Sequence, residues 1–145
     1  MQKGFTLVEL LIVLAVMGTL FLIVGSISLS SLPSTQLSSE ADTVEQTLRR
    51  AQAKSISQQA DLAWGVHLSS AQMTLFAGST YVGRNQTYDE VHAFQTGIVK
   101  SGLSDVVFDF RTGETADTGT VTLTASSTGE VKTLTVNQAG RVNKQ

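Results

Sequence analysis

The chain begins with an apolar segment whose pattern differs from everything that follows. Residues 5–25, FTLVELLIVLAVMGTLFLIVG, contain a single charged residue, Glu9, and the next charge is Glu40. As a helix rising about 1.5 Å per residue, such a segment spans about 31 Å, the thickness of a bilayer's hydrocarbon core. The segment has no polar face. The pattern therefore predicts a helix surrounded by lipid or by other apolar helices.

A second helical pattern follows, and this one is apolar on one face only. Pro33, the only proline, is expected to stop or kink the first helix, because proline lacks an amide proton and clashes with the preceding turn. Ser34 or Thr35 would then cap a restart. Apolar residues recur at spacings of four and three, at Leu37, Ala41, Val44, Leu48 and Ala51. The charged residues fall mostly off this stripe: Glu40, Asp42, Glu45, Arg49, Arg50 and Lys54. We expect this helix to pack on a sheet, with a coiled coil as the alternative.

After Gln59 the period of the pattern changes to two, which predicts β-strands. Strands are expected over 62–68, 72–76, 91–94, 106–110, 120–125 and 132–136, and most of 77–102 is expected to be loop. The last two strands are predicted to form an antiparallel hairpin. The fold class is therefore α+β, a long N-terminal hydrophobic helix packed on a C-terminal antiparallel β-sheet domain. The expected boundaries are 5–29 for the apolar, membrane-length helix, 30–60 for its amphipathic continuation and 61–145 for the sheet domain.

Composition narrows the class of protein. The chain has 145 residues, a formal net charge of −2 and no cysteine. This length fits one domain. The net negative charge does not indicate a surface that binds nucleic acid in general. The absence of cysteine excludes disulfides and cysteine-ligated metal sites.

Glu9 makes the apolar segment unusual, because an ionised side chain near a bilayer is expensive and usually functional. A secretory signal peptide and a plain membrane anchor are the simple alternatives, although neither gains from a carboxylate. Lys3 is the only charge before the segment. By the positive-inside tendency, the N-terminus is expected to stay cytoplasmic and the C-terminal domain to cross the membrane.

The residues around Glu9 closely resemble the class III signal of type IV pilins and type II secretion pseudopilins. The resemblance lies in G-F-T-L-V-E-L-L-I-V-L-A-V-M-G, which begins at Gly4. It implies that a prepilin peptidase removes residues 1–4 as a leader, cutting between Gly4 and Phe5. It also implies that Phe5 is then N-methylated, and that Glu9 becomes the fifth residue of the mature chain. Glycine before the cut suits an extended backbone in a protease.

Cleavage would create a positive α-amine at Phe5, a counter-charge for Glu9. A carboxylate in a low dielectric is tolerable when paired and costly alone. The amine could belong to the same helix, one turn away, or to a neighbouring subunit, and the resemblance favours the neighbour. It further implies three kinds of partner besides membrane lipid: the prepilin peptidase, other pilin or pseudopilin subunits, and an inner-membrane assembly platform. The implied location is a single pass through the inner membrane, followed by a pilus or pseudopilus.

A second resemblance covers the C-terminal part. The order V-x-F-x-x-x-x-G (Val106, Phe108, Gly113), strand, turn, strand and A-G-R-V (139–142) is similar to H-type minor pseudopilins and FimT-like minor pilins. Some FimT-like pilins are associated with DNA uptake and carry a glycine-arginine motif followed by a second arginine. Here Asn143 stands at that second position. The function predicted is a minor pilin or pseudopilin. The alternatives are a DNA-receptor minor pilin of a competence pilus and a major pilin.

Other candidate chemistry is sparse. After Val131 the chain carries Lys132, Arg141 and Lys144 without an acidic residue, and we expect at most weak DNA contacts from Arg141 and Lys144.

His67 and His92 lack metal-ligand spacing, and His67 is expected to be structural. Asp105 and Asp109 would share a strand face as a solvated pair, and Trp64 is expected in the core. No enzyme, cofactor or metal site is predicted.

Overall fold

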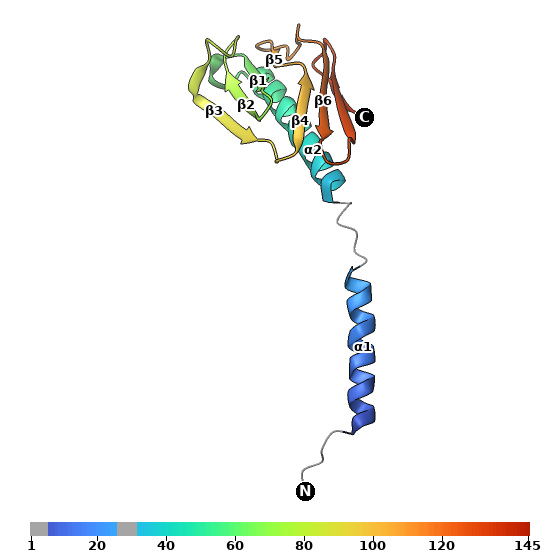
Figure 1. The fold of residues 1–145 in the computed structure, drawn as a ribbon. Coiled ribbons are helices and arrows are strands. Elements are labelled where there is room, and N and C mark those ends of the chain that lie inside the picture. The colour runs from blue at the N-terminus through green and yellow to red at the C-terminus, as the bar shows by residue number, and fades with distance from the viewer. Residues whose placement is uncertain (1–5, 26–31) are drawn as a thin grey trace. The chain divides into compact units, whose positions relative to one another are not determined.

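The computed structural model describes residues 6–25 and 32–145, and the chain divides into two compact units, residues 1–31 and 32–145. The first unit contains helix α1 (Leu7–Gly25). The second contains helix α2 (Leu32–Ile56), a short 3₁₀-helix (Gln59–Asp61) and strands β1 to β8 (Figure 1). Each unit is described separately.

Helix α1 is apolar around its whole circumference. Ten large apolar side chains between Leu7 and Leu20 are 51–77% exposed. Soluble monomers rarely expose a contiguous apolar surface of this kind, so α1 is built to be covered by something. Among the helices of the described residues, none is both long and apolar enough to cross a membrane.

The strands of the second unit form two antiparallel sheets. The first, in the order β3-β2-β1-β5, consists of β3 (Asn85–Ala93), β2 (Gln72–Ala77), β1 (Trp64–Leu68) and β5 (Asp105–Phe108). The second, in the order β4-β6-β7-β8, consists of β4 (Ile98–Gly102), β6 (Gly119–Ala125), β7 (Val131–Val136) and β8 (Val142–Lys144). Together with α2 they confirm the predicted α+β fold.

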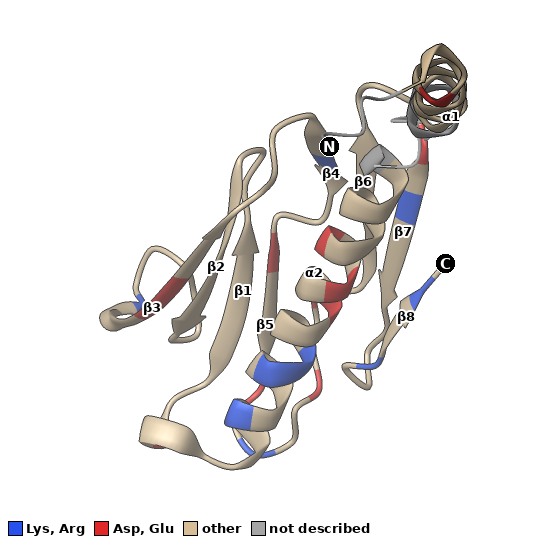
Figure 2. Cartoon of the chain, turned by 90° about the horizontal axis from the view of Figure 1, so that it is seen from below, with Lys and Arg blue, Asp and Glu red and all other residues tan. Residues whose placement is uncertain are grey.

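Helix α2 joins the two sheets into one core. It contacts β1, β2 and β5 of the first sheet and β6, β7 and β8 of the second, and Figure 2 shows one sheet on either side of it. The predicted stripe is fully buried: Leu37, Ala41, Val44, Leu48 and Ala51 are each 0% exposed. This confirms a helix packed on sheets rather than a coiled coil. Trp64 is 1% exposed and lies in the same core, as predicted.

The predicted helix restart at Ser34 or Thr35 is wrong, because α2 already begins at Leu32. Pro33 therefore lies in the first turn of α2. Proline is well tolerated there, since the amide proton that it lacks would have no partner within the helix.

The second half of the sheet region differs from the prediction. The β6–β7 hairpin is confirmed, with Thr122 opposite Thr133. The loop predicted over most of 77–102 is wrong, because β3 runs for nine residues and β4 pairs with β6. Strand β3 is an edge strand exposed at nearly every position, so its sequence shows no alternation. Strand β8, which pairs with β7, was not predicted either, because three residues are too few to form a pattern.

Candidate functional site

The start of α1 positions Glu9 through a reciprocal pair of bonds with Thr6. The Glu9 Oε2 atom accepts hydrogen bonds from the Thr6 backbone N–H at 3.0 Å and from the Thr6 hydroxyl at 2.9 Å. In return, the Thr6 hydroxyl oxygen accepts a bond from the Glu9 N–H at 3.3 Å. This arrangement is a capping box, which satisfies amide protons that have no partner within the helix.

Sequence reasoning missed Thr6, although the T-x-x-E spacing ahead of an apolar run is the signal for a capping box. Gly4 and Phe5, the predicted cleavage and methylation residues, lie outside the described residues. The Glu9 carboxylate lies in the first turn of α1, where the positive end of the helix dipole stabilises a negative charge. Its Oε1 atom makes no hydrogen bond to any described residue. The capping box therefore leaves half of the carboxylate available.

The predicted cation cluster at the C-terminus is only partly assembled. Lys144 forms an ion pair with Asp42 of α2, and this hydrogen bond raises the pKa of Lys144. Lys144 therefore has a partner within the chain, in an ion pair that is exposed to solvent. Arg141 lies exposed between β7 and β8 and has no ion pair with another described residue. It lines a shallow groove of about 390 Å³ together with Arg49, Gln52, Val142 and Asn143.

Arg49 adds a cation that the sequence pattern did not place beside Arg141. The Arg49 guanidinium lies 2.6 Å from the Glu45 carboxylate and 3.4 Å from the Val142 carbonyl oxygen. Because Glu45 offsets its charge, this groove is only weakly basic. Of the two predicted DNA-contact residues, Arg141 is accessible and Lys144 is engaged.

Gln52 of α2 connects the turn at Gly113 with the turn at Ala139. Its side-chain amide donates hydrogen bonds to the Gly113 carbonyl at 2.9 Å and to the Ala139 carbonyl at 3.1 Å. Gly140 has a φ of 72°, and a Cβ atom there would lie 2.3 Å from Gln52 Nε2. Glycine at position 140 is thus required by the backbone and by the close approach of α2.

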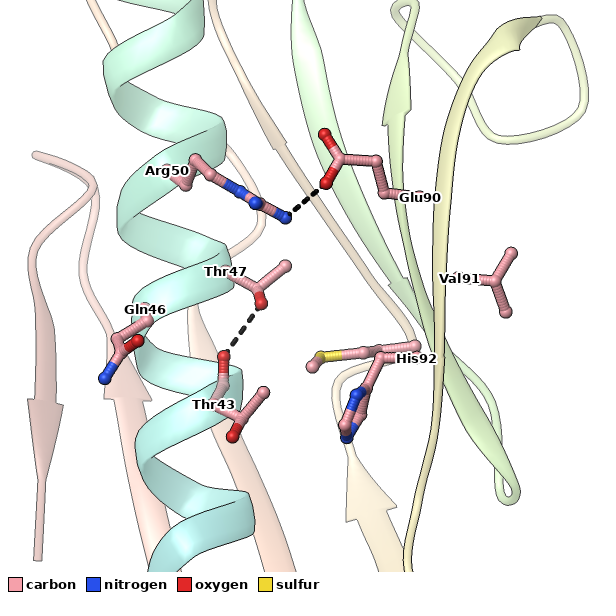
Figure 3. A pocket seen from close by; sticks show the side chains of 8 residues that line it. Thr43, Gln46, Thr47, Arg50, Glu90, Val91 and His92 are labelled. Carbon is pink, nitrogen blue, oxygen red and sulfur yellow. Dashed lines mark hydrogen bonds and ion pairs between the residues drawn. The ribbon is translucent and has the colours of Figure 1, made fainter.

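A groove of about 310 Å³ lies between α2 and β3 (Figure 3). Its lining residues are Thr43, Gln46, Thr47, Arg50, Met73, Glu90, Val91 and His92. Arg50 and Glu90 point toward one another across it, with 2.8 Å between Arg50 Nη2 and Glu90 Oε2. Lys54 Nζ lies 3.2 Å from the other oxygen of Glu90. The charges at this groove are therefore paired within the chain.

Glu40 holds the neighbouring part of α2 to the first sheet. Its side chain is 2% exposed and accepts bonds from the Gln95 N–H at 3.2 Å and from His92, whose Nε2 lies at 3.0 Å. The charged residues of α2 lie mostly off the buried stripe, as predicted, and the exception is Glu40, one turn from both Leu37 and Val44. A buried carboxylate persists because it is fully bonded. This contact gives His92 a structural role.

The structure also shows the contacts of His67 and of the two residues suspected as an acid pair, Asp105 and Asp109. His67 Nδ1 lies 2.8 Å from Asp105 Oδ1, and the His67 ring stacks on Tyr81 with 3.8 Å between ring centroids. Asp109 lies beyond the end of β5 and is exposed. Asp105 is thus paired with His67 rather than with Asp109. In the part of the chain that the structure describes, no group of three or more metal-binding side chains occurs.

The comparison with known families assigns a role to the N-terminal segment. The prokaryotic N-terminal methylation motif matches residues 1–25. The chain carries the processing signal of a type IV pilin or pseudopilin. This signal implies processing by prepilin peptidase, membrane anchoring before assembly, and assembly with other pilin subunits. It points to a structural protein rather than an enzyme. No curated protein and no solved structure matches the chain significantly.

Proposed function

We propose that this chain is a minor pilin or pseudopilin, of the H-type or FimT-like class, in a type IV pilus-like or type II secretion filament. The methylation motif over residues 1–25 carries the pilin-type part of the proposal, and the H-type or FimT-like class rests on the resemblance over residues 106–142. The apolar surface of α1 supports it, because a helix with no polar face needs lipid before assembly and other helices afterwards. In the globular unit, both histidines and the buried carboxylate of Glu40 have partners within the chain.

In this proposal the precursor inserts with its N-terminus in the cytoplasm and its globular unit outside. A peptidase removes residues 1–4, Phe5 is methylated, and an inner-membrane assembly platform moves α1 from lipid into a helical bundle. Lipid already keeps these side chains away from water, so the bundle is held by close packing between helices rather than by a further hydrophobic gain. The same helix thus serves first as an anchor and then as the core of the filament.

The capping box defines what Glu9 contributes. The Thr6 N–H belongs to an internal peptide bond both before and after cleavage, so this bond survives processing. The amine created at Phe5 is an additional positive charge at the same end of α1. We infer that Glu9 keeps its bonds to Thr6 and offers Oε1 to the Phe5 amine of a neighbouring subunit. This pairing would fix the axial register between subunits.

DNA reception is the second candidate function, and a major pilin the third. The accessible Arg141, beside Arg49 in a shallow groove, supports contact with phosphate. The ion pairs of Lys144 with Asp42 and of Arg49 with Glu45 argue against a strongly basic surface. The groove is therefore suited to weak and salt-sensitive binding at most.

Two variants in the native host test the proposed function. Gly4→Leu places a side chain in front of the scissile bond, and we expect the precursor to accumulate uncut in the membrane. Glu9→Ala should be cleaved and inserted normally, yet recovered poorly in sheared filaments, with Glu9→Asp as the charge-retaining control. Cleavage of Gly4→Leu at the wild-type position, or normal incorporation of Glu9→Ala, would contradict the corresponding step.

A further inference from the structure

The second sheet has one face without any charge. One face packs Val121, Leu123, Leu134 and Val136 in the core. The opposite face follows from the strand register: Val99, Thr124 and Val131 form one row, and Ser101, Thr122 and Thr133 the next. A third row contains Thr120, Thr135 and Asn143. We call these nine residues the threonine face. They belong to all four strands of the sheet.

The lysines of the same strands are on the other face. Lys100 and Lys132 are both register partners of Leu123, and Lys144 is the partner of Leu134. Lys100 Nζ reaches the Leu68 carbonyl oxygen at 2.9 Å, and Lys144 pairs with Asp42. This placement is the reverse of the usual one, in which charged side chains cover the solvent face of a sheet and prevent association. Figure 2 shows β6, a central strand, without a charged residue.

The threonine face also has unused hydrogen-bonding capacity. No hydroxyl of Thr120, Thr122, Thr124, Thr133 or Thr135 bonds to another residue of the described structure. Threonine methyl and hydroxyl groups therefore make up much of this face, with strands about 4.8 Å apart and same-face residues about 6.6 Å apart along each strand. Nine positions of about 4.8 by 6.6 Å each give the face an area of roughly 300 Å².

We propose that the threonine face docks an uncharged surface on the globular unit of a neighbouring pilin-type subunit in the filament. This inference rests on the proposed function. Charge depletion at the centre of a patch is typical of protein interfaces. Nucleic acid does not fit, because the face offers no cation to a phosphate. A charged protein surface does not fit either, since its charges would lose water without gaining a partner.

The small area of the face fits an occupant that is already tethered nearby. A stable complex between free proteins buries about 800 Å² on each partner, well above the roughly 300 Å² available here. A neighbour held by α1 in the helical bundle is already close, so a small contact suffices to orient it. The threonine face would then set the angle between globular units, while α1 provides most of the binding.

Thr122→Lys tests this proposal, because Thr122 occupies the middle row on a central strand. We expect full-length Thr122→Lys to be cleaved normally and to enter sheared filaments about tenfold less than wild type, since an unpaired buried charge readily costs the corresponding 1.4 kcal/mol. Thr87→Lys, on the exposed edge strand β3, is the matched control and should enter within about twofold of wild type, as expected for a surface change. Fluorescence of the single tryptophan, Trp64, checks that each variant remains folded.

A crosslink identifies the occupant. The chain has no cysteine, so Thr122→Cys introduces a unique thiol for a short bifunctional crosslinker in assembled filaments. We expect an adduct with a second pilin-type subunit, recognised by mass spectrometry of the attached chain. Normal incorporation of folded Thr122→Lys would overturn the docking surface while leaving the filament function intact. An adduct with a protein of another class, or none, would overturn it as well. Absence of the wild-type chain from filaments would remove both proposals.

Discussion

Ser55, near the end of α2, forms hydrogen bonds to two strands of the first sheet, β1 and β5. Its side chain is 0% exposed, its hydroxyl donates to the Phe108 carbonyl at 3.0 Å, and its oxygen accepts from the Trp64 N–H at 2.8 Å. One hydroxyl thus satisfies a buried acceptor on β5 and a buried donor on β1. The Ser55→Ala variant deletes the single oxygen atom that makes both bonds.

The expected loss of stability follows from these two backbone groups. Each buried group left without a partner costs about 1–3 kcal/mol, and partial relaxation places the total near 2–4 kcal/mol. For a unit of this size, that corresponds to a fall in Tm of roughly 6–20 °C. Ser57→Ala is the matched control, since Ser57 is exposed and its hydroxyl bonds only to the Lys54 carbonyl within the same turn.

Trp64 makes the measurement direct, because it is the only tryptophan and its own amide is one of the two partners. Urea titration of the full-length chain in detergent, followed by Trp64 fluorescence, reports unfolding of the globular unit. A change below about 0.5 kcal/mol for Ser55→Ala, the range of ordinary surface substitutions, would refute the reasoning. A loss equal to that of Ser57→Ala would refute it equally.

Three further substitutions test other contacts. Gly140→Ala forces a left-handed backbone onto a side chain that collides with Gln52, and should lower the unfolding free energy by about 2 kcal/mol or more, measured by urea titration. Glu40→Ala should lower the free energy of unfolding by about 2–3 kcal/mol. Glu40→Gln should lower it much less, because the amide can still bond to His92, and equal losses for the two variants would contradict this. Arg141→Ala should weaken any DNA binding and reduce its salt dependence by about one phosphate contact, and unchanged gel shifts across salt concentrations would exclude a DNA role for Arg141.

Local patterns predicted the helices better than the sheets. The spacing of Leu37, Ala41, Val44, Leu48 and Ala51 placed the buried face of α2 correctly, because helical periodicity depends only on the sequence of the helix. The same spacing continues to Ser55, so a polar residue on that face could have been recognised as a buried bonding group. The β6–β7 hairpin was predicted for a similar reason, since its two strands are neighbours in sequence.

Nonlocal pairing was not predictable in this way. Nothing near Asp105 indicates that β5 pairs with β1, so the division into two sheets was missed. Strand β4 carries Lys100 at a core-facing position, where its ammonium donates to the carbonyl oxygens of Leu68, on another strand, and of Gly102. For the site, the spacing of Gly4, Phe5 and Glu9 was sufficient to predict the processing signal. The partners of Lys144 and Glu40 required the fold, because they lie on distant segments.

The mass of the native protein tests the central claim most directly. The chain should be isolated from its own membranes and filaments and measured intact, with the N-terminal peptide sequenced by mass spectrometry. The account predicts a chain that begins at Phe5, lacks residues 1–4, retains α1 and carries one methyl group on its amine. Loss of the whole apolar segment, as after signal-peptide cleavage, or retention of Met1 through Gly4 in filaments, would contradict it.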